Sequence, residues 1–131
     1  VANMANIAAL MWEFLPDVNW TGFYRTDPNS PDGELVLGPF AGRPACIRIP
    51  KGKGVCGAAA ESAETQLVPD VHAFPGHIAC DSETASELVV PVMRDDKVIA
   101  VIDLDSPSRA RFDEQDRDGI EALAQMLASR I

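Results

Sequence analysis

The sequence has few basic residues. It contains 11 Lys and Arg against 20 Asp and Glu, which gives a net charge of −9 at pH 7. Nucleic acids and anionic membranes attract basic surfaces, so this balance disfavours both as partners. No apolar run approaches the roughly 18 residues of a membrane span, and the first residues lack a secretory signal pattern. We therefore expect a cytoplasmic protein that binds neither nucleic acid nor membrane.

Cysteine is also scarce. An odd set of 3 cysteines does not form a dense disulfide framework, which indicates a reducing compartment with free thiols. Cys46, Cys56 and Cys80 all lie in or beside stretches that we predict to be irregular, where cysteines are often reactive. Two interpretations stay open: a redox pair that cycles through a disulfide, or ordinary free thiols.

Apolar periodicity predicts one α+β domain over residues 1–131. The hydrophobic content of 47% is sufficient for a core at this length. Helical spacing predicts helices at Met4–Leu15, at Val55–Glu64 and from Phe112 onward, where Asp113 and Asp116 form a capping box. The predicted strands are Trp20–Arg25, Glu34–Leu37, Ala45–Ile49, Gln66–Val68, Glu87–Met93 and Lys97–Asp105. This order favours helices packed against a mainly antiparallel sheet.

Two stretches are predicted to be irregular. Residues 38–57 are rich in glycine and proline, with only Ala45–Ile49 as a short strand, and residues 69–83 form a long loop. Long structured loops in compact domains often carry functional residues. The second loop holds His72, His77 and Cys80, and we expect both histidines to be exposed to solvent.

Three acidic residues are predicted to meet at one end of the last hairpin. Asp103 and Asp105 share one face at the end of an apolar strand. A tight turn at Asp95–Asp96 places Glu87 beside them. Clustered carboxyls resist ionising together, so one can stay protonated and donate to a substrate oxygen. The alternative is a solvent-exposed strand end.

Trp20 and Tyr24 also share one face of a predicted strand. Their rings can line a pocket for a polarised sulfur centre, or they can simply pack in the core. A metal site made by His72, His77 and Cys80, completed by Cys46 or Cys56, is a further alternative. The spacing of these residues does not match the usual zinc motifs, so we predict no metal.

Seven segments together resemble the free methionine-(R)-sulfoxide reductases, a family of GAF domains. The resemblance covers nearly the whole chain from Ala2, and the mutual spacing of the three cysteines makes it specific. The segments are Asn19–Arg25, Gly38–Phe40, Cys46–Ile49, Gly52–Gly57, Val68–Val71, His77–Asp81 and Asp103–Ser106.

The resemblance implies a GAF fold, a homodimer and a role for each cysteine. It implies that Cys80 is the nucleophile, Cys46 the resolving cysteine and Cys56 a secondary thiol. The pocket-lining positions that it implies are Trp20, Tyr24, Glu87, Asp103 and Asp105. The implied reaction reduces free methionine-(R)-sulfoxide through a sulfenic acid and a disulfide, without a cofactor, and thioredoxin restores the thiols. The alternatives are a ligand-binding GAF sensor and a metal-binding redox sensor.

Overall fold

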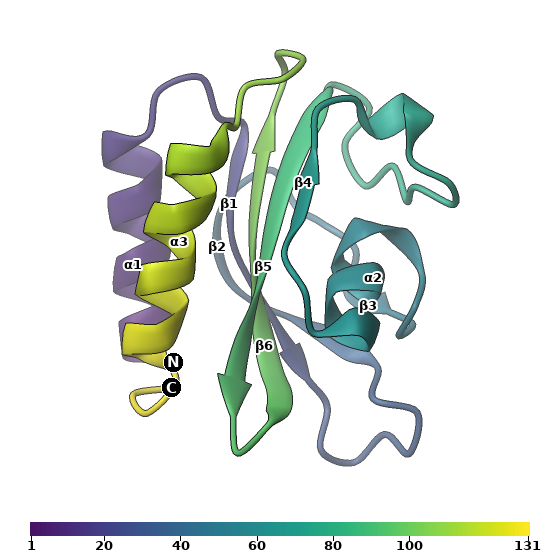
Figure 1. Cartoon of the computed structure of the whole chain (residues 1–131), viewed down its shortest axis with the longest axis vertical. Helices are drawn as coiled ribbons and strands as arrows, with labels where there is room; N and C mark the ends of the chain where they lie inside the picture. The colour runs from purple at the N-terminus through teal and green to yellow at the C-terminus, as the bar shows by residue number, and fades with distance from the viewer.

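The computed structural model describes residues 1–131 and consists of one sheet with helices on both faces (Figure 1). None of the helices combines the length and apolar character needed to cross a membrane. In chain order the elements are α1 (Ala2–Phe14), β1 (Trp20–Thr26), β2 (Leu35–Gly42), β3 (Arg48–Ile49), α2 (Gly54–Ser62), β4 (Gln66–Val68), the 3₁₀ helix η1 (Val71–Ala73), β5 (Ser86–Arg94), β6 (Lys97–Ser106) and α3 (Glu114–Leu127).

The sheet has six strands in the order β3-β2-β1-β6-β5-β4, and all neighbouring strands are antiparallel. The predicted α+β class and mainly antiparallel sheet are therefore confirmed. The most apolar strand, β6, lies between β1 and β5, and its Val101 and Ile102 are fully buried. Both faces of β6 are covered, as its continuous apolar run predicts.

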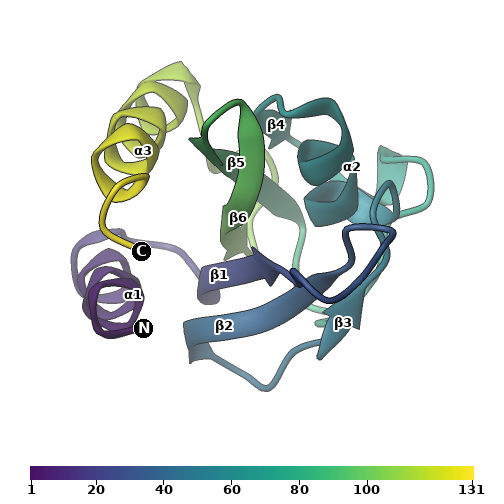
Figure 2. The same ribbon diagram turned by 90° about the horizontal axis from the view of Figure 1, so that it is seen from below.

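Two apolar cores lie on opposite faces of the sheet. On one face, α1 and α3 lie side by side and pack against Phe23, Leu88 and Ile102 (Figure 2). On the other face, α2 packs against the strand residues whose side chains point the opposite way, including Tyr24 and Val101. Alternation along each strand thus divides the apolar residues between the two faces. The second face also carries the acidic residues discussed below.

One predicted turn is confirmed, and one predicted irregular stretch is partly wrong. Asp95 and Asp96 have positive φ values of 51° and 62° between the paired Arg94 and Lys97, as in a two-residue hairpin turn. β2, however, continues to Gly42 through the stretch that we predicted to be irregular. It does so because an irregularity in the β1–β2 ladder, between the Gly22 and Tyr24 pairs, accommodates Pro39.

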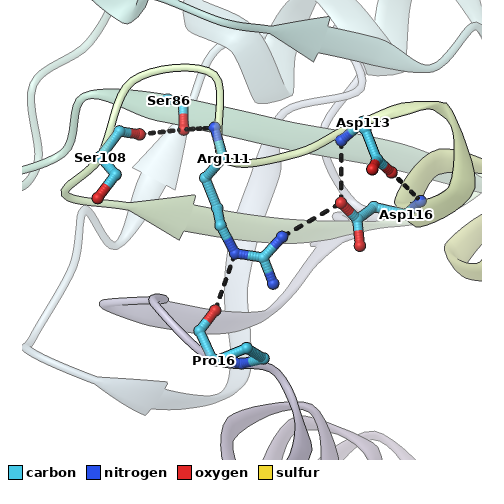
Figure 3. A network of polar contacts seen from close by, with 6 residues as sticks. All are labelled: Pro16, Ser86, Ser108, Arg111, Asp113 and Asp116. Atoms are coloured by element: carbon cyan, nitrogen blue, oxygen red, sulfur yellow. Dashed lines mark hydrogen bonds and ion pairs between the residues drawn. The ribbon is translucent and has the colours of Figure 1, made fainter.

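Arg111 joins three elements on the side of the sheet covered by α1 and α3 (Figure 3). Its Nε donates to the Pro16 carbonyl at 2.8 Å, and its Nη1 donates to Asp116 Oδ2 at 3.2 Å. Its backbone N–H donates to Ser86 Oγ at 3.3 Å. Asp116 also forms the predicted capping box with Asp113 at the start of α3. The end of α1, β5 and the start of α3 are therefore held together by one side chain and its backbone.

We expect Arg111→Ala to lower the free energy of unfolding by about 2 kcal/mol, because it removes two charge-assisted hydrogen bonds from a largely buried side chain. Urea unfolding followed by circular dichroism measures the change. The matched control is Arg117→Ala, which removes a more exposed ion pair to Asp118 and should cost less than about 0.5 kcal/mol. An equal decrease in the free energy of unfolding in both variants would contradict the connecting role of Arg111.

Candidate active site

Strand pairing brings three carboxyl groups to one cavity, as the hairpin register predicts. Glu87 pairs with Asp105 across β5 and β6, and Asp105 pairs with Trp20 across β6 and β1. Asp103 lies two residues before Asp105 and therefore on the same face of β6. All three carboxyl groups line a cavity of about 40 Å³, so the alternative of an exposed strand end is wrong.

Burial keeps protons on these carboxyls. Burial first, and the charge of Asp105 second, raise the pKa of Glu87 to about 8. Burial and Glu87 raise the pKa of Asp103 well above its ordinary value, and burial and Asp103 do the same for the pKa of Asp105. Asp103 Oδ1 is buried and has no hydrogen-bond partner. The cavity thus presents carboxyl groups able to donate a proton at neutral pH.

We expect the thermal unfolding midpoint of the disulfide-bonded protein to fall as pH rises from about 5 to about 8 and to level off above that. The pKa of Glu87 is about 8 when folded and 4.5 ordinarily, so the folded chain holds a proton that the unfolded chain releases. Stability is therefore lost as pH rises through the folded pKa. Calorimetry should show a smaller decrease for Glu87→Gln and an unchanged decrease for the exposed control Glu114→Gln. An identical pH dependence in wild type and Glu87→Gln would contradict this cause.

Trp20 and Tyr24 line the cavity and also pack in the second apolar core. The Trp20 ring stacks on Tyr24 at 5.9 Å and on Phe40 at 5.2 Å between ring centroids. Gly22 makes room for this stack, because a Cβ there would lie 2.4 Å from Phe40 Cβ and 2.8 Å from the Trp20 ring. The aromatic wall is therefore continuous beside the carboxyls.

The same two aromatic residues fix the loop that carries Cys46. The Trp20 indole N–H donates to the Arg43 carbonyl at 3.1 Å, and the Tyr24 hydroxyl donates to the Cys46 carbonyl at 2.9 Å. Burial and the nearby Asp103 charge raise the pKa of Tyr24, so its hydroxyl stays protonated as a donor. Side-chain type and strand position alone do not predict this second role.

Cys46 and Cys80 form a disulfide whose Cα atoms are 5.7 Å apart, and Cys80 lines the cavity. Cys80 is exposed and Cys46 is half-buried. The pairing agrees with the roles that the family resemblance implies. These two cysteines are therefore joined directly, although 34 residues separate them in the chain.

Cys56 lies within the predicted helix Val55–Glu64, but it is more enclosed than expected for a cysteine beside an irregular stretch. It lies on α2 and is buried, with its Sγ 3.9 Å from Glu87 Oε1. Burial, and the charges of Asp103 and Glu87, raise the pKa of this thiol. It lines the cavity together with the three carboxyl residues, and its thiol is free while Cys46 and Cys80 are joined.

His77 also departs from the prediction. Its side chain is 13% exposed, and its Nε2 lies 3.7 Å from Glu87 Oε2. Burial lowers its pKa, which favours the neutral imidazole. His72 is exposed, as expected, and the structure does not bring His72, His77 and Cys80 together as a metal-binding group. The group that could hold a metal is instead Cys56, Glu87 and Asp103.

Asn19 is a site residue to which the sequence assigned no role. Its Nδ2 donates to Asp81 Oδ2 at 3.4 Å and to Thr84 Oγ1 at 3.3 Å. These bonds tie the segment that follows Cys80 to the start of β1. The only sequence feature that could indicate this role is the position of Asn19 directly before Trp20 in the Asn19–Arg25 motif.

Comparison with known proteins agrees with this arrangement. The GAF domain family model matches residues 4–131. The chain is 48% identical to the free methionine-R-sulfoxide reductase of Saccharomyces cerevisiae, covering 97% of this chain and 73% of the yeast protein. It is 46% identical to the Escherichia coli enzyme of the same name, covering 97% and 74% of the two chains. The chain belongs to the free methionine-(R)-sulfoxide reductase family.

Solved structures of this reductase family have the same fold. The free methionine-R-sulfoxide reductase of Neisseria meningitidis, solved in complex with its substrate, superposes with a TM-score of 0.94 at 47% identity. The match covers 98% of this chain and 75% of the Neisseria chain. The GAF fold implied by the sequence resemblance is thereby confirmed.

Proposed function

We propose that this chain reduces free methionine-(R)-sulfoxide to methionine with Cys80 as the nucleophile. The observation that carries the proposal is the Cys46–Cys80 disulfide, whose Cys80 lines a cavity together with three carboxyls and an aromatic stack. A thiol pair supplies two electrons, and buried acids supply protons to a leaving oxygen. The names of its relatives support the same substrate.

Substrate binding uses the carboxyls in two protonation states. An ionised carboxylate among Glu87, Asp103 and Asp105 binds the substrate ammonium group. A protonated one donates to the sulfoxide oxygen, which makes the sulfur electrophilic. The faces of Trp20 and Tyr24 pack against the polarised S-methyl group.

The chemical step transfers oxygen from the substrate to the enzyme. The Cys80 thiolate attacks the substrate sulfur and forms a transient S–S bond, while a carboxyl protonates the sulfoxide oxygen. The substrate S–O bond and the S–S bond then break as the oxygen bonds to Cys80 Sγ, which releases methionine and leaves Cys80 as a sulfenic acid. The Cys46 thiol then displaces the hydroxyl, which forms the disulfide and releases water. Each turnover thus converts one sulfoxide and two thiols into methionine, a disulfide and water.

A dithiol protein of the thioredoxin type is the proposed reductant. Its attacking thiolate opens the Cys46–Cys80 bond, and its second thiol completes the exchange. Exposure of Cys80 supports this approach. Cys56 is buried and is assigned the secondary role of a thiol that exchanges with the disulfide when the α2 region moves.

We further propose that the chain acts as a cytoplasmic homodimer. The outer surface of α1 carries apolar side chains, among them Trp12, which is 44% exposed, and Phe14, which is 71% exposed. Apolar groups gathered on one helix are costly to leave in water and are typical of interfaces. Sedimentation analysis of the wild type and of Phe14→Glu tests whether the chain forms a homodimer. A monomeric wild type would contradict the homodimer.

We expect N-acetyl methionine-(R)-sulfoxide to be reduced at least about 100-fold less efficiently than the free amino acid. Acetylation removes the ammonium charge and leaves a buried carboxylate without its partner. The comparison uses kcat/KM with dithiothreitol as the reductant, followed by chromatography of both products. Similar values for the two compounds would show that the pocket does not recognise the free amine.

A further inference from the structure

Cys56 is the reactive group in the cavity that the reductase cycle uses least. Its Sγ, a Glu87 oxygen and an Asp103 oxygen all lie within 4.8 Å of one another. The three residues come from α2, β5 and β6, and all are buried. A thiol and two carboxyls thus converge from three elements of the fold.

A second observation points to a ligand at this cluster. Asp103 is 6% exposed, and its Oδ1 has no hydrogen-bond partner in the cavity wall. A buried oxygen without a partner costs about 1–3 kcal/mol. A cation in the cavity would satisfy this oxygen, and the cavity of about 40 Å³ already has room for an ion and a water molecule.

The donor set selects the kind of cation. A thiolate favours Zn²⁺ and similar ions over Mg²⁺ and Ca²⁺, which prefer oxygen ligands alone. Tetrahedral zinc holds sulfur and oxygen ligands about 3.5 Å apart, given its bond lengths to each. The 3.9 Å between Cys56 Sγ and Glu87 Oε1 needs only a small contraction.

His77 lies beside this group but is not one of the three residues whose ligand atoms lie within 4.8 Å of one another, so it reaches a bound ion only by moving its side chain. Its Nε2 lies 3.7 Å from Glu87 Oε2, whereas Cys56 Sγ approaches the other oxygen of that carboxyl, Oε1. A neutral imidazole is a good zinc ligand. This residue belongs to the loop that carries Cys80, so a bound ion would link α2 and the sheet to the nucleophile loop.

We propose that Cys56, Glu87 and Asp103, with His77 as the fourth ligand, form a Zn²⁺ site that competes with the sulfoxide substrate. The ion occupies the carboxyls that the substrate needs, so the two exclude each other. Zinc is therefore an inhibitor, and in the inhibited enzyme the Cys56 thiolate is bound to the ion. The competition rests on the proposed function, whereas binding of the ion does not.

The test uses the disulfide-bonded protein, because only Cys56 then has a free thiol. Isothermal titration with Zn²⁺ should give one ion per chain. Co²⁺ should give a near-ultraviolet thiolate-to-cobalt charge-transfer band. Cys56→Ser should remove the band and weaken Zn²⁺ binding at least about 100-fold, as should Asp103→Asn. The exposed control Glu114→Gln should change the affinity less than twofold.

Two results would overturn the metal site: no stoichiometric Zn²⁺ binding to the wild type, or a cobalt band that persists in Cys56→Ser. Circular dichroism of each variant shows that loss of binding is not loss of fold. Competition is measured in the double variant Cys46→Ser and Cys80→Ser, where free methionine-(R)-sulfoxide should weaken Zn²⁺ binding at least tenfold. If Zn²⁺ binds but free methionine-(R)-sulfoxide does not weaken its binding, the metal site stands and the result counts against the proposed substrate.

Discussion

Cys80→Ser is expected to lower turnover of free methionine-(R)-sulfoxide by at least about 10⁴-fold, because a hydroxyl is not ionised at neutral pH and cannot replace the thiolate. The residue is exposed, so the fold should survive the change. The measurement is methionine formed per chain with dithiothreitol present. Turnover above one hundredth of the wild-type rate would show that Cys80 is not the nucleophile.

Cys46→Ser is the matched control, since it removes the other half of the disulfide but leaves Cys80 in place. Without reductant, this variant should release one methionine per chain and accumulate a sulfenic acid on Cys80. Dimedone labelling and mass spectrometry locate that group. Labelling of Cys46 in the reciprocal Cys80→Ser variant would reverse the two assignments.

Asp103→Asn and Glu87→Gln are expected to lower kcat/KM by about 10²- to 10³-fold each, because an amide of the same shape cannot transfer a proton to the sulfoxide oxygen. Both side chains are buried in the cavity wall, so binding geometry should change little. Steady-state kinetics with the free amino acid measures the loss.

The exposed pair Asp118→Asn and Glu114→Gln serves as the control and should leave kcat/KM unchanged. Losses below threefold in both buried variants would mean that the sulfoxide oxygen receives its proton from another group. Cys80→Ser can be added to each variant to confirm that the remaining activity still depends on the same thiol.

The carboxyl cluster could be predicted from the sequence because local rules determine most of it. The Asp95–Asp96 turn pairs Arg94 with Lys97 and so places Glu87 near the Asp103–Asp105 end of the hairpin. A register shift between Val92 and Met93 then sets Glu87 directly opposite Asp105, and the turn alone does not predict this shift. Alternation along β6 then places Asp103 on the same face. The turn and the alternation follow from neighbours in the chain, whereas the register shift that puts Glu87 on this face does not.

The loop residues could not be predicted in this way. His77 is buried against Glu87 because the segment before Cys80 folds over the sheet, and nothing periodic in that segment indicates its path. Cys46 and Cys80 are separated by 34 residues, a spacing that does not fix their distance. Their pairing was indicated by the family resemblance and not by the spacing. Cys56 is buried because α2 turns it toward the carboxyls.

The most direct test is epimer-resolved consumption of a racemic mixture of free methionine sulfoxide by the wild-type protein, with dithiothreitol as the reductant. We predict that the R epimer disappears with an equal gain of methionine, while the S epimer remains. A protein with an intact Cys46–Cys80 disulfide cycle that leaves both epimers unchanged would contradict the proposed function.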